Sequence, residues 1–324
     1  MLPAEVLSYG KILILFINNV IHIFTYRSIM NKTGSRKRSF SVTGFMKLTR
    51  VPNLLIIGLT QYLTVIFLVA YPENWYDKLY DIKLLLLSSS TILIAAAGYI
   101  INDYYDIKID YVNKPDKVVV GKLVKRRIVL VSHAVLNILG IAIGFYLSIY
   151  VGIINFFAGF VLWIYSNQLK RMPFIGNFAI ATLTGMSILV VAMYYQRNFP
   201  LLFYYAVFAF SINLVREVIK DMEDLRGDMR FGSKTLPIVW GLRKTKYFLY
   251  VLIGIFVFSL FYLSHQLENH VLSLFFLLLL VPIIYLIYLL YRADSQKRFH
   301  QLSTYCKLLM LAGISSMIFF NFKL

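Results

Sequence analysis

The sequence is poor in cysteine and in acidic residues. Only one of the 324 residues is a cysteine, Cys306. A single thiol excludes a disulfide within the chain and any metal cluster built from several cysteines. Asp and Glu together number 15 against 33 Lys and Arg, which gives a formal net charge of +18. In a chain with so few acidic residues, several of them close together in the sequence indicate a functional site.

Two common binding signatures are also missing. The segment "GKLVKR" at residues 121–126 lacks the Gly-Lys-Ser/Thr ending of a phosphate-binding loop. No metal-ligand spacing relates the histidines His133, His265, His270 and His300. The sequence therefore predicts neither a nucleotide-binding loop nor a histidine metal centre.

Long apolar runs dominate the chain, which is 59% hydrophobic with a mean hydropathy of +0.71. A soluble domain cannot cover that much apolar surface, so the composition indicates an all-α polytopic membrane protein. A bilayer core of about 30 Å needs roughly 20 apolar residues per helix. We predict a bundle of nine transmembrane helices around a central cavity, spanning residues 53–72, 83–101, 127–146, 148–166, 176–195, 200–219, 246–264, 271–291 and 303–321.

The start of the chain is predicted to be separate from this bundle. The segment "KILILFINNVIHIFTY" is apolar but short, Asn18 and Asn19 interrupt it, and no small-residue cleavage site follows. These features favour an interfacial helix or an imperfect signal-anchor over a cleaved signal peptide. We therefore expect an apolar segment and basic linker at 1–44 and one membrane domain at 45–324.

Lys and Arg are distributed unevenly between the loops that join the predicted spans. One side of the membrane collects 28 of them and the other side 4. Loops with many basic residues face the cytoplasm, so the chain is predicted to lie in the plasma (inner) membrane with these loops cytoplasmic. The same rule accounts for the net charge of +18, and we expect no nucleic-acid partner and no obligate protein partner.

Acidic residues gather at two places next to predicted spans. The first acidic cluster follows the second span and contains Asp103, Asp106 and Asp110. The second acidic cluster follows the sixth span and contains Asp221, Asp224 and Asp228. Both have the spacing i, i+3, i+7, which places three side chains on one face of a helix.

Four predicted spans separate the two acidic clusters, and an even number returns the chain to the same side. Both clusters are therefore expected at the cytoplasmic mouth of the cavity, facing each other. Six carboxylates in one place repel unless cations neutralise them, and such hard oxygen ligands suit Mg²⁺. Ionisable groups at membrane depth are functional as a rule. We expect all six aspartates to bind Mg²⁺ and to act in catalysis.

Polar and basic residues close to the clusters are candidates for binding a diphosphate. They come from the stretches "LTRVPNLL", "YSNQLKRMP" and "REVIK" and from the residue before the first acidic cluster. Lys and Arg make charge-assisted hydrogen bonds to phosphate oxygens. The predicted substrate-binding residues are Arg50, Asn53, Asn102, Tyr165, Lys170, Arg171, Arg216 and Lys220.

These motifs resemble the UbiA superfamily of intramembrane prenyltransferases. The pattern NDxxDxxxD matches Asn102–Asp110, YSxxLKR matches Tyr165–Arg171, and DxEDxxGD resembles Asp221–Asp228. The resemblance covers about residues 45–321. It implies Mg²⁺-dependent transfer of a long prenyl group from an allylic diphosphate to an acceptor, with the isoprenoid tail taken from membrane lipid.

Within that superfamily, "REVIKDMEDLRGDMRFGSKTLPIVWG" most resembles the geranylgeranylglycerol-phosphate geranylgeranyltransferases, which implies a prenylglycerol phosphate as acceptor. One departure concerns the segment after the first motif, where "RPDRPIPSG" is common and this chain has "KPDKVVVGK". An aromatic acceptor of the 4-hydroxybenzoate type is the alternative within the superfamily. A divalent-cation channel or transporter is the alternative from another class, although a pore favours acids deeper in the membrane or at both ends.

The asymmetry of the basic residues predicts that loops 102–127 and 216–246 are both cytoplasmic. Single cysteines introduced into each loop should react with an impermeant thiol reagent only after the cells are opened. A cysteine introduced in place of Arg197, on the predicted opposite side, should react in intact cells. Labelling of the two loops from opposite sides would rule out a shared site.

Overall fold

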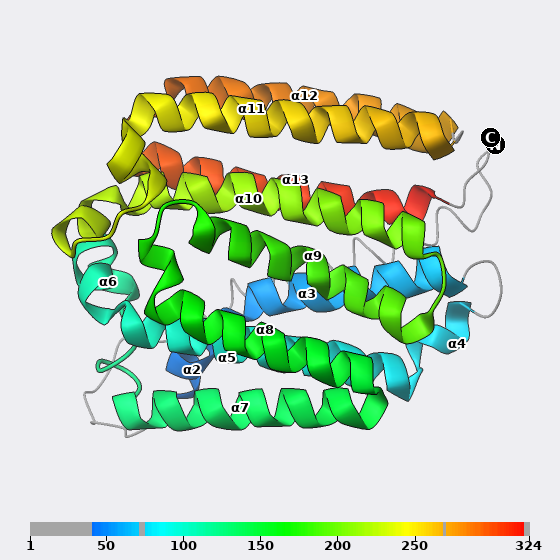
Figure 1. The fold of residues 1–324 in the computed structure, drawn as a ribbon, viewed down its shortest axis with the longest axis horizontal. Coiled ribbons are helices and arrows are strands. Elements are labelled where there is room, and N and C mark those ends of the chain that lie inside the picture. The colour runs from blue at the N-terminus through cyan, green and yellow to red at the C-terminus, as the bar shows by residue number, and fades with distance from the viewer. Residues whose placement is uncertain (1–40, 71–74, 268–269, 321–324) are drawn as a thin grey trace. The chain divides into compact units, whose positions relative to one another are not determined.

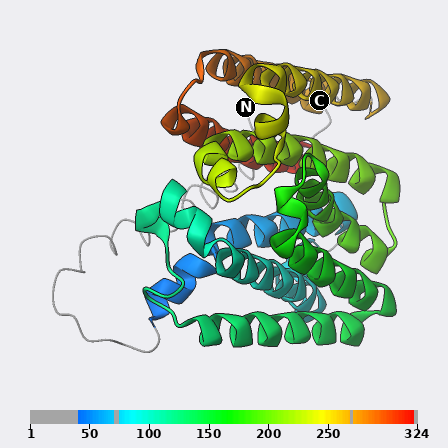
Figure 2. The ribbon, with the colours of Figure 1, turned by 60° about the vertical axis from the view of Figure 1, so that its left-hand side comes forward.

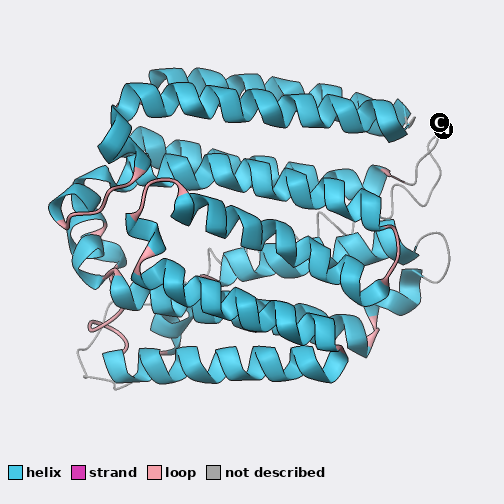
Figure 3. Cartoon of the chain, in the orientation of Figure 1, coloured by secondary structure: helices cyan, strands magenta, loops and turns pink. Residues whose placement is uncertain are grey.

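The computed structural model describes residues 41–70, 75–267 and 270–320, all within one compact unit, Ser39–Leu324. This part of the chain contains no β-strand (Figure 3). Residues 1–40 lie outside it, so the predicted N-terminal segment and the domain boundary at residue 45 stay predictions. The α-helices are α2 (Val42–Leu48), α3 (Val51–Leu63), α4 (Trp75–Leu79), α5 (Ile82–Tyr105), α6 (Ile107–Asn113), α7 (Arg126–Leu147), α8 (Ile149–Asn167), α9 (Ile175–Tyr195), α10 (Phe199–Arg230), α11 (Leu236–Leu267), α12 (His270–Arg292) and α13 (Gln296–Phe319).

Nine helical segments within the described residues are long and apolar enough to cross a membrane. They correspond in order to the nine spans predicted from hydropathy, which confirms the predicted fold class there. The first span combines α3 with a π-helical continuation, η1 (Thr64–Ala70). Three helices extend well beyond the prediction: α10 runs on to Arg230, α13 begins at Gln296, and α11 begins at Leu236 with a kink at Gly241. In α10 and α13 the charged ends lower the hydropathy without interrupting the helix.

The spans pack in a closed order around the cavity. Contacts follow the chain from α3 through α5, α7, α8, α9, α10, α11 and α12 to α13, and α13 also contacts α3 and α10. Figure 1 shows α11 and α12 side by side at one edge, next to α10 and α13, with α7 at the opposite edge. The turned view in Figure 2 keeps the same neighbours. Helices α5 and α10, which carry the acidic clusters, therefore both lie inside the bundle.

Helix α10 carries the second acidic cluster on a direct continuation of a membrane span. Its 32 residues correspond to a length of about 48 Å, more than the roughly 30 Å of a bilayer core. The last turns therefore extend past the apolar layer while the backbone hydrogen bonds continue. This continuity fixes Asp221, Asp224 and Asp228 in helical register.

The first acidic cluster is divided between two helices. Helix α5 ends at Tyr105, Asp106 is the residue between, and α6 begins at Ile107. Asp106 has φ −87° and ψ 0°, outside ordinary helical geometry. The expectation of one continuous helix face for Asp103, Asp106 and Asp110 is therefore wrong, because the chain bends at Asp106 and α6 packs against α10 instead.

A close contact fixes α6 on α10. The side chain of Asn113 donates to the carbonyl of Asp224 at 3.0 Å and accepts from the N–H of Gly227 at 2.8 Å. A Cβ at position 227 would lie 2.4 Å from Asn113 Nδ2. Glycine is therefore required at position 227 for the amide of Asn113 to reach the backbone of α10.

Replacing Gly227 with alanine should move α6 away from α10 and lower the thermal unfolding temperature in detergent. Overpacking of this kind costs about 1–3 kcal/mol. Gly254→Ala in α11 is the matched control, because a Cβ there meets no atom within 4 Å. Equal unfolding temperatures for the two variants would contradict the tight contact.

Candidate active site

A cavity inside the bundle has a polar mouth and an apolar interior. Its interior is lined mainly by apolar side chains from four spans, including Ile57, Ile94, Leu162, Leu183, Met186 and Val190. Its mouth is lined by Arg50, Asn53, Asn102, Arg216, Glu217 and Lys220. The arrangement suits an amphipathic ligand with a charged head and a hydrocarbon tail.

Arg50 lies at the start of α3 in a strained backbone conformation, and contacts with α5 stabilise it. Its φ of 52° and ψ of 51° are left-handed, which is rare for a residue with a side chain. The guanidinium binds Asp103 Oδ1 at 2.7 Å and lies 5.0 Å from the centre of the Tyr99 ring. Local strain at a functional position is common, and these contacts stabilise it here.

Asp106 is bound on both carboxylate oxygens. Asn102 Nδ2 donates to Oδ2 at 2.9 Å, and Lys170 Nζ binds Oδ1. Lys170 comes from the short helix η3 (Leu169–Arg171) after α8, so this ion pair joins α8 to the bend between α5 and α6. Both partners of Asp106 were predicted as substrate-binding residues.

Asp110 forms no ion pair within the described part of the chain. Burial and the negative charges of Asp106, Asp103 and Asp224 together raise the pKa of its carboxyl to about 7. Asp224 belongs to the second acidic cluster. The two clusters are therefore close enough to repel each other, as the sequence predicted.

The second acidic cluster is held by neighbours that the sequence did not single out. Asn177 Nδ2, at the start of α9, donates to Asp221 Oδ2 at 2.8 Å. Lys114 Nζ, just after α6, lies 2.8 Å from Asp224 Oδ1 and 2.9 Å from Glu223 Oε1. Together the two acids hold the pKa of Lys114 above its usual value, although burial opposes this shift.

The two clusters together carry more negative charge than the neighbouring cations neutralise. The negative charges of Asp224 and Asp106 act on Asp228, which forms no ion pair within the described residues. As the side chains stand, no three acidic, histidine or cysteine residues in the described part of the chain form a group that could hold a metal ion. Lysines and Arg50 instead bind the carboxylates. The carboxylates that no cation neutralises nevertheless offer the oxygen ligands that a divalent cation prefers.

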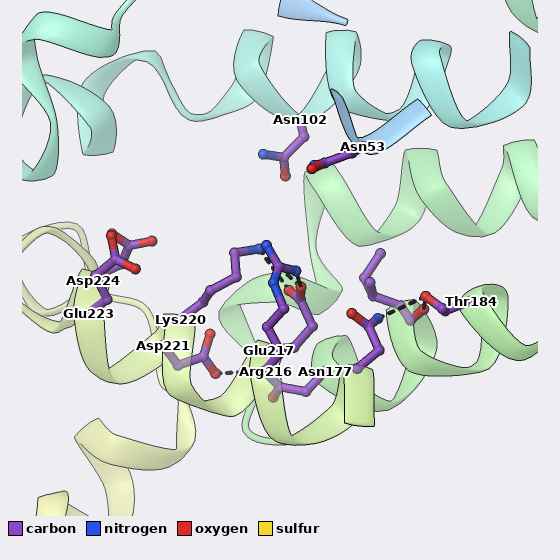
Figure 4. A network of polar contacts seen from close by, with 12 residues as sticks. Asn53, Asn102, Asn177, Thr184, Arg216, Glu217, Lys220, Asp221, Glu223 and Asp224 are labelled. Carbon is purple, nitrogen blue, oxygen red and sulfur yellow. Dashed lines mark hydrogen bonds and ion pairs between the residues drawn. The ribbon is translucent and has the colours of Figure 1, made fainter. Parts of the chain in front are cut away.

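Basic side chains line the mouth of the cavity one turn before the second acidic cluster on α10. Arg216 Nη1 lies 2.9 Å from Glu217 Oε1, and Lys220 Nζ lies 2.9 Å from Glu217 Oε2. Figure 4 shows the ends of Arg216 and Lys220 gathered around Glu217, with Asn53 and Asn102 on the other side. Tyr165 lines the same cavity, close enough for Glu217, Asp221 and Asp106 to act on its hydroxyl. Arg171 is exposed. Its backbone carbonyl accepts a hydrogen bond from the N–H of Lys234.

Sequence reasoning missed several polar residues of this region, and each had a weak signal. Asn177 interrupts an apolar span, and Lys114 belongs to the segment that departs from the common motif. His300, treated as an ordinary helix residue, lies 2.9 Å from Glu223 Oε1. The assigned roles of the predicted metal and substrate ligands stay predictions.

The described residues hold nine candidate membrane spans, and an amphipathic cavity with carboxylate clusters beside its mouth lies between five of them, which suits an enzyme that acts on a membrane lipid. The model of the UbiA prenyltransferase family matches residues 59–311. The chain belongs to this family, and the predicted family, enzyme class and multi-pass membrane character are confirmed.

Relatives of similar sequence are digeranylgeranylglyceryl phosphate synthases of archaea. The enzyme of Thermococcus gammatolerans is 35% identical over 204 residues, which is 63% of this chain and 71% of the relative. That of Methanosphaera stadtmanae is 30% identical over 241 residues, 73% of this chain and 87% of the relative.

Solved structures share the fold. A digeranylgeranylglyceryl phosphate synthase superposes with a TM-score of 0.67 at 25% identity, covering 86% of this chain and 97% of that one. A UbiA homologue from Archaeoglobus fulgidus, bound to GPP and Mg²⁺, gives a TM-score of 0.64 at 14% identity and covers 85% and 99%.

Lys114→Met should weaken the contact of α6 with α10 and reduce prenyl transfer. The variant leaves Glu223 and Asp224 without their shared lysine, and an unpaired charged group of this kind costs about 1–3 kcal/mol. The unfolding temperature in detergent is the measurement. Lys117→Met, at an exposed position three residues later, is the control and should match the unmodified protein. A Lys114 variant as stable as this control would show that the ion pairs do not hold α6.

Proposed function

We propose that this chain transfers a long prenyl group from an allylic diphosphate to a prenylglycerol phosphate in an Mg²⁺-dependent reaction that releases diphosphate. The observation that carries the proposal is the pair of neighbouring carboxylate clusters beside the charged mouth of an apolar cavity, where Asp103 binds Arg50 and Asp106 binds Asn102. The names of the archaeal relatives support the same acceptor.

The acidic clusters supply the ligands for the divalent cation. Asp110 and Asp228 lack ion-pair partners in the described residues, while Asp103, Asp106 and Asp224 are oriented by Arg50, Lys170 and Lys114. Magnesium prefers a few carboxylates together with phosphate oxygens. Mg²⁺ bound there would neutralise negative charge on the leaving diphosphate. The A. fulgidus homologue bound to GPP and Mg²⁺ supports this combination.

The basic residues assist the departure of the diphosphate. Lys170 is 10% exposed, so its charge acts in a medium that screens it little. As the allylic carbon–oxygen bond breaks, negative charge grows on the diphosphate oxygens next to this ammonium. Donors already in place where charge develops stabilise the transition state most.

The apolar interior protects the allylic cation. Aliphatic side chains such as Ile94, Leu162 and Val190 line the space behind the mouth and suit the hydrocarbon tail. Exclusion of water prevents capture of the cation as a free prenyl alcohol. The acceptor hydroxyl oxygen then forms the new ether bond, and the departing diphosphate can take the hydroxyl proton.

We further propose that the protein lies in the plasma membrane and that its site opens to the cytoplasm. The support is the excess of basic residues in the loops on the side of both acidic clusters. Water-soluble diphosphate would leave on that side.

A panel of acceptors, assayed with one long-chain allylic diphosphate, tests the proposal. Prenylglycerol phosphate should be converted in the presence of Mg²⁺ and not after chelation with EDTA. Prenylglycerol without phosphate and 4-hydroxybenzoate should react poorly. Prenylation of 4-hydroxybenzoate alone would establish the aromatic alternative instead.

Within the same assay, Asp106→Ala and Asp221→Ala should each reduce transfer about a hundredfold or more, since each removes a ligand from one cluster. Asp116→Ala is the matched control, because Asp116 is exposed on the short helix η2 (Pro115–Lys117). Normal transfer by either cluster variant at saturating Mg²⁺ would contradict the two-cluster site.

A further inference from the structure

A lysine of the last span contributes to the charge at the mouth of the cavity. Lys307, in α13, is half-buried, and its Nζ donates to Asn53 Oδ1 at 3.2 Å. Asn53 itself lines the mouth. Lys307 has this amide oxygen as its hydrogen-bond partner and forms no ion pair with a carboxylate within the described residues.

Lys307 adds to an accumulation of positive charge. Arg216, Lys220 and Arg50 act on it electrostatically, and Glu217 opposes them. Arg50 is paired with Asp103, and both Arg216 and Lys220 are paired with Glu217, so these four cations, Lys307 included, have two carboxylates as ion-pair partners in the described residues. Like charges in a partly buried region are costly unless an anion neutralises them. The local surplus of two positive charges matches a phosphate monoester near neutral pH.

A hydrogen-bond donor in the same group is also left over. The Nε–H of Arg216 is buried and has no acceptor among the described residues. Buried donors are almost always satisfied, so this one lacks a partner such as a water or a ligand oxygen. Arg216 Nη1 is already bound to Glu217, which orients the guanidinium at the mouth of the cavity.

We propose that Lys307, with Arg216 and Lys220, binds the phosphate of the acceptor lipid. This assignment rests on the proposed function. These three residues and Arg50 form the basic group, which has a surplus of positive charge around Glu217. The acidic clusters have a surplus of negative charge. Two separate surpluses suit two different ligands: a cation with its diphosphate at the clusters, and a phosphate monoester at the basic group.

Lys307→Met tests the assignment, because methionine keeps the length of the side chain and removes the charge. With donor saturating, the variant should raise the KM for prenylglycerol phosphate about tenfold or more, the scale of one charge-assisted hydrogen bond. The KM for the allylic diphosphate should change less than about threefold, within the spread of surface substitutions. Lys307→Arg, which keeps the charge, should recover most of the affinity for the acceptor.

Lys297→Met is the matched control, since Lys297 is exposed on the same helix. It should leave both KM values unchanged. On the unmodified protein, a saturated alkyl phosphate should inhibit competitively with the acceptor and not with the donor, which tests the site even if Lys307→Met folds poorly.

The outcomes separate the assignment from the proposed function. Failure of the unmodified protein to prenylate the phosphate acceptor overturns both. Normal transfer with an unchanged acceptor KM in Lys307→Met overturns only the assignment. A raised KM for the donor would assign the basic group to the diphosphate, and so would inhibition by the alkyl phosphate that competes with the donor. Either result also overturns the assignment to the acceptor phosphate.

Discussion

The structure depends on keeping carboxylates charged at the end of apolar helices. Ionised acids are expensive near lipid unless cations pair with them. Here the cations come from other segments of the chain: Arg50 at the start of α3 binds Asp103 on α5, and Lys170 after α8 binds Asp106. Lys114 binds the end of α10 in the same way. Each pair therefore neutralises an acid and joins two parts of the bundle.

These pairs leave an uneven distribution of charge, and the function follows from it. Asp110 and Asp228 stay without ion-pair partners in the described residues, while Glu217, one turn before the second acidic cluster on α10, is paired with both Arg216 and Lys220. The acidic clusters can accept a cation, and the basic side chains at the mouth can accept an anion. A reaction between two phosphate-bearing lipids needs both, with an apolar space behind them for the prenyl tail.

The backbone contributes where side chains alone cannot position the site. The bend at Asp106 turns α6 away from the direction of α5 and brings it to α10. The absence of a Cβ at Gly227 lets Asn113 approach the α10 backbone. Because α10 is one continuous helix, this contact sets the separation of the two clusters. Small changes at the junction should therefore affect the site directly.

The sequence by itself determined the spans, the positions of the two acidic clusters at the ends of spans, and their placement at the same end of the bundle. Hydropathy, basic loops and the spacing i, i+3, i+7 are local properties that survive without a fold. Only the tertiary structure decided which cation meets which acid, that the first cluster bends at Asp106, and that Lys307 reaches Asn53 from 254 residues away. Such partners depend on how distant helices pack, and no local pattern in one sequence records that packing.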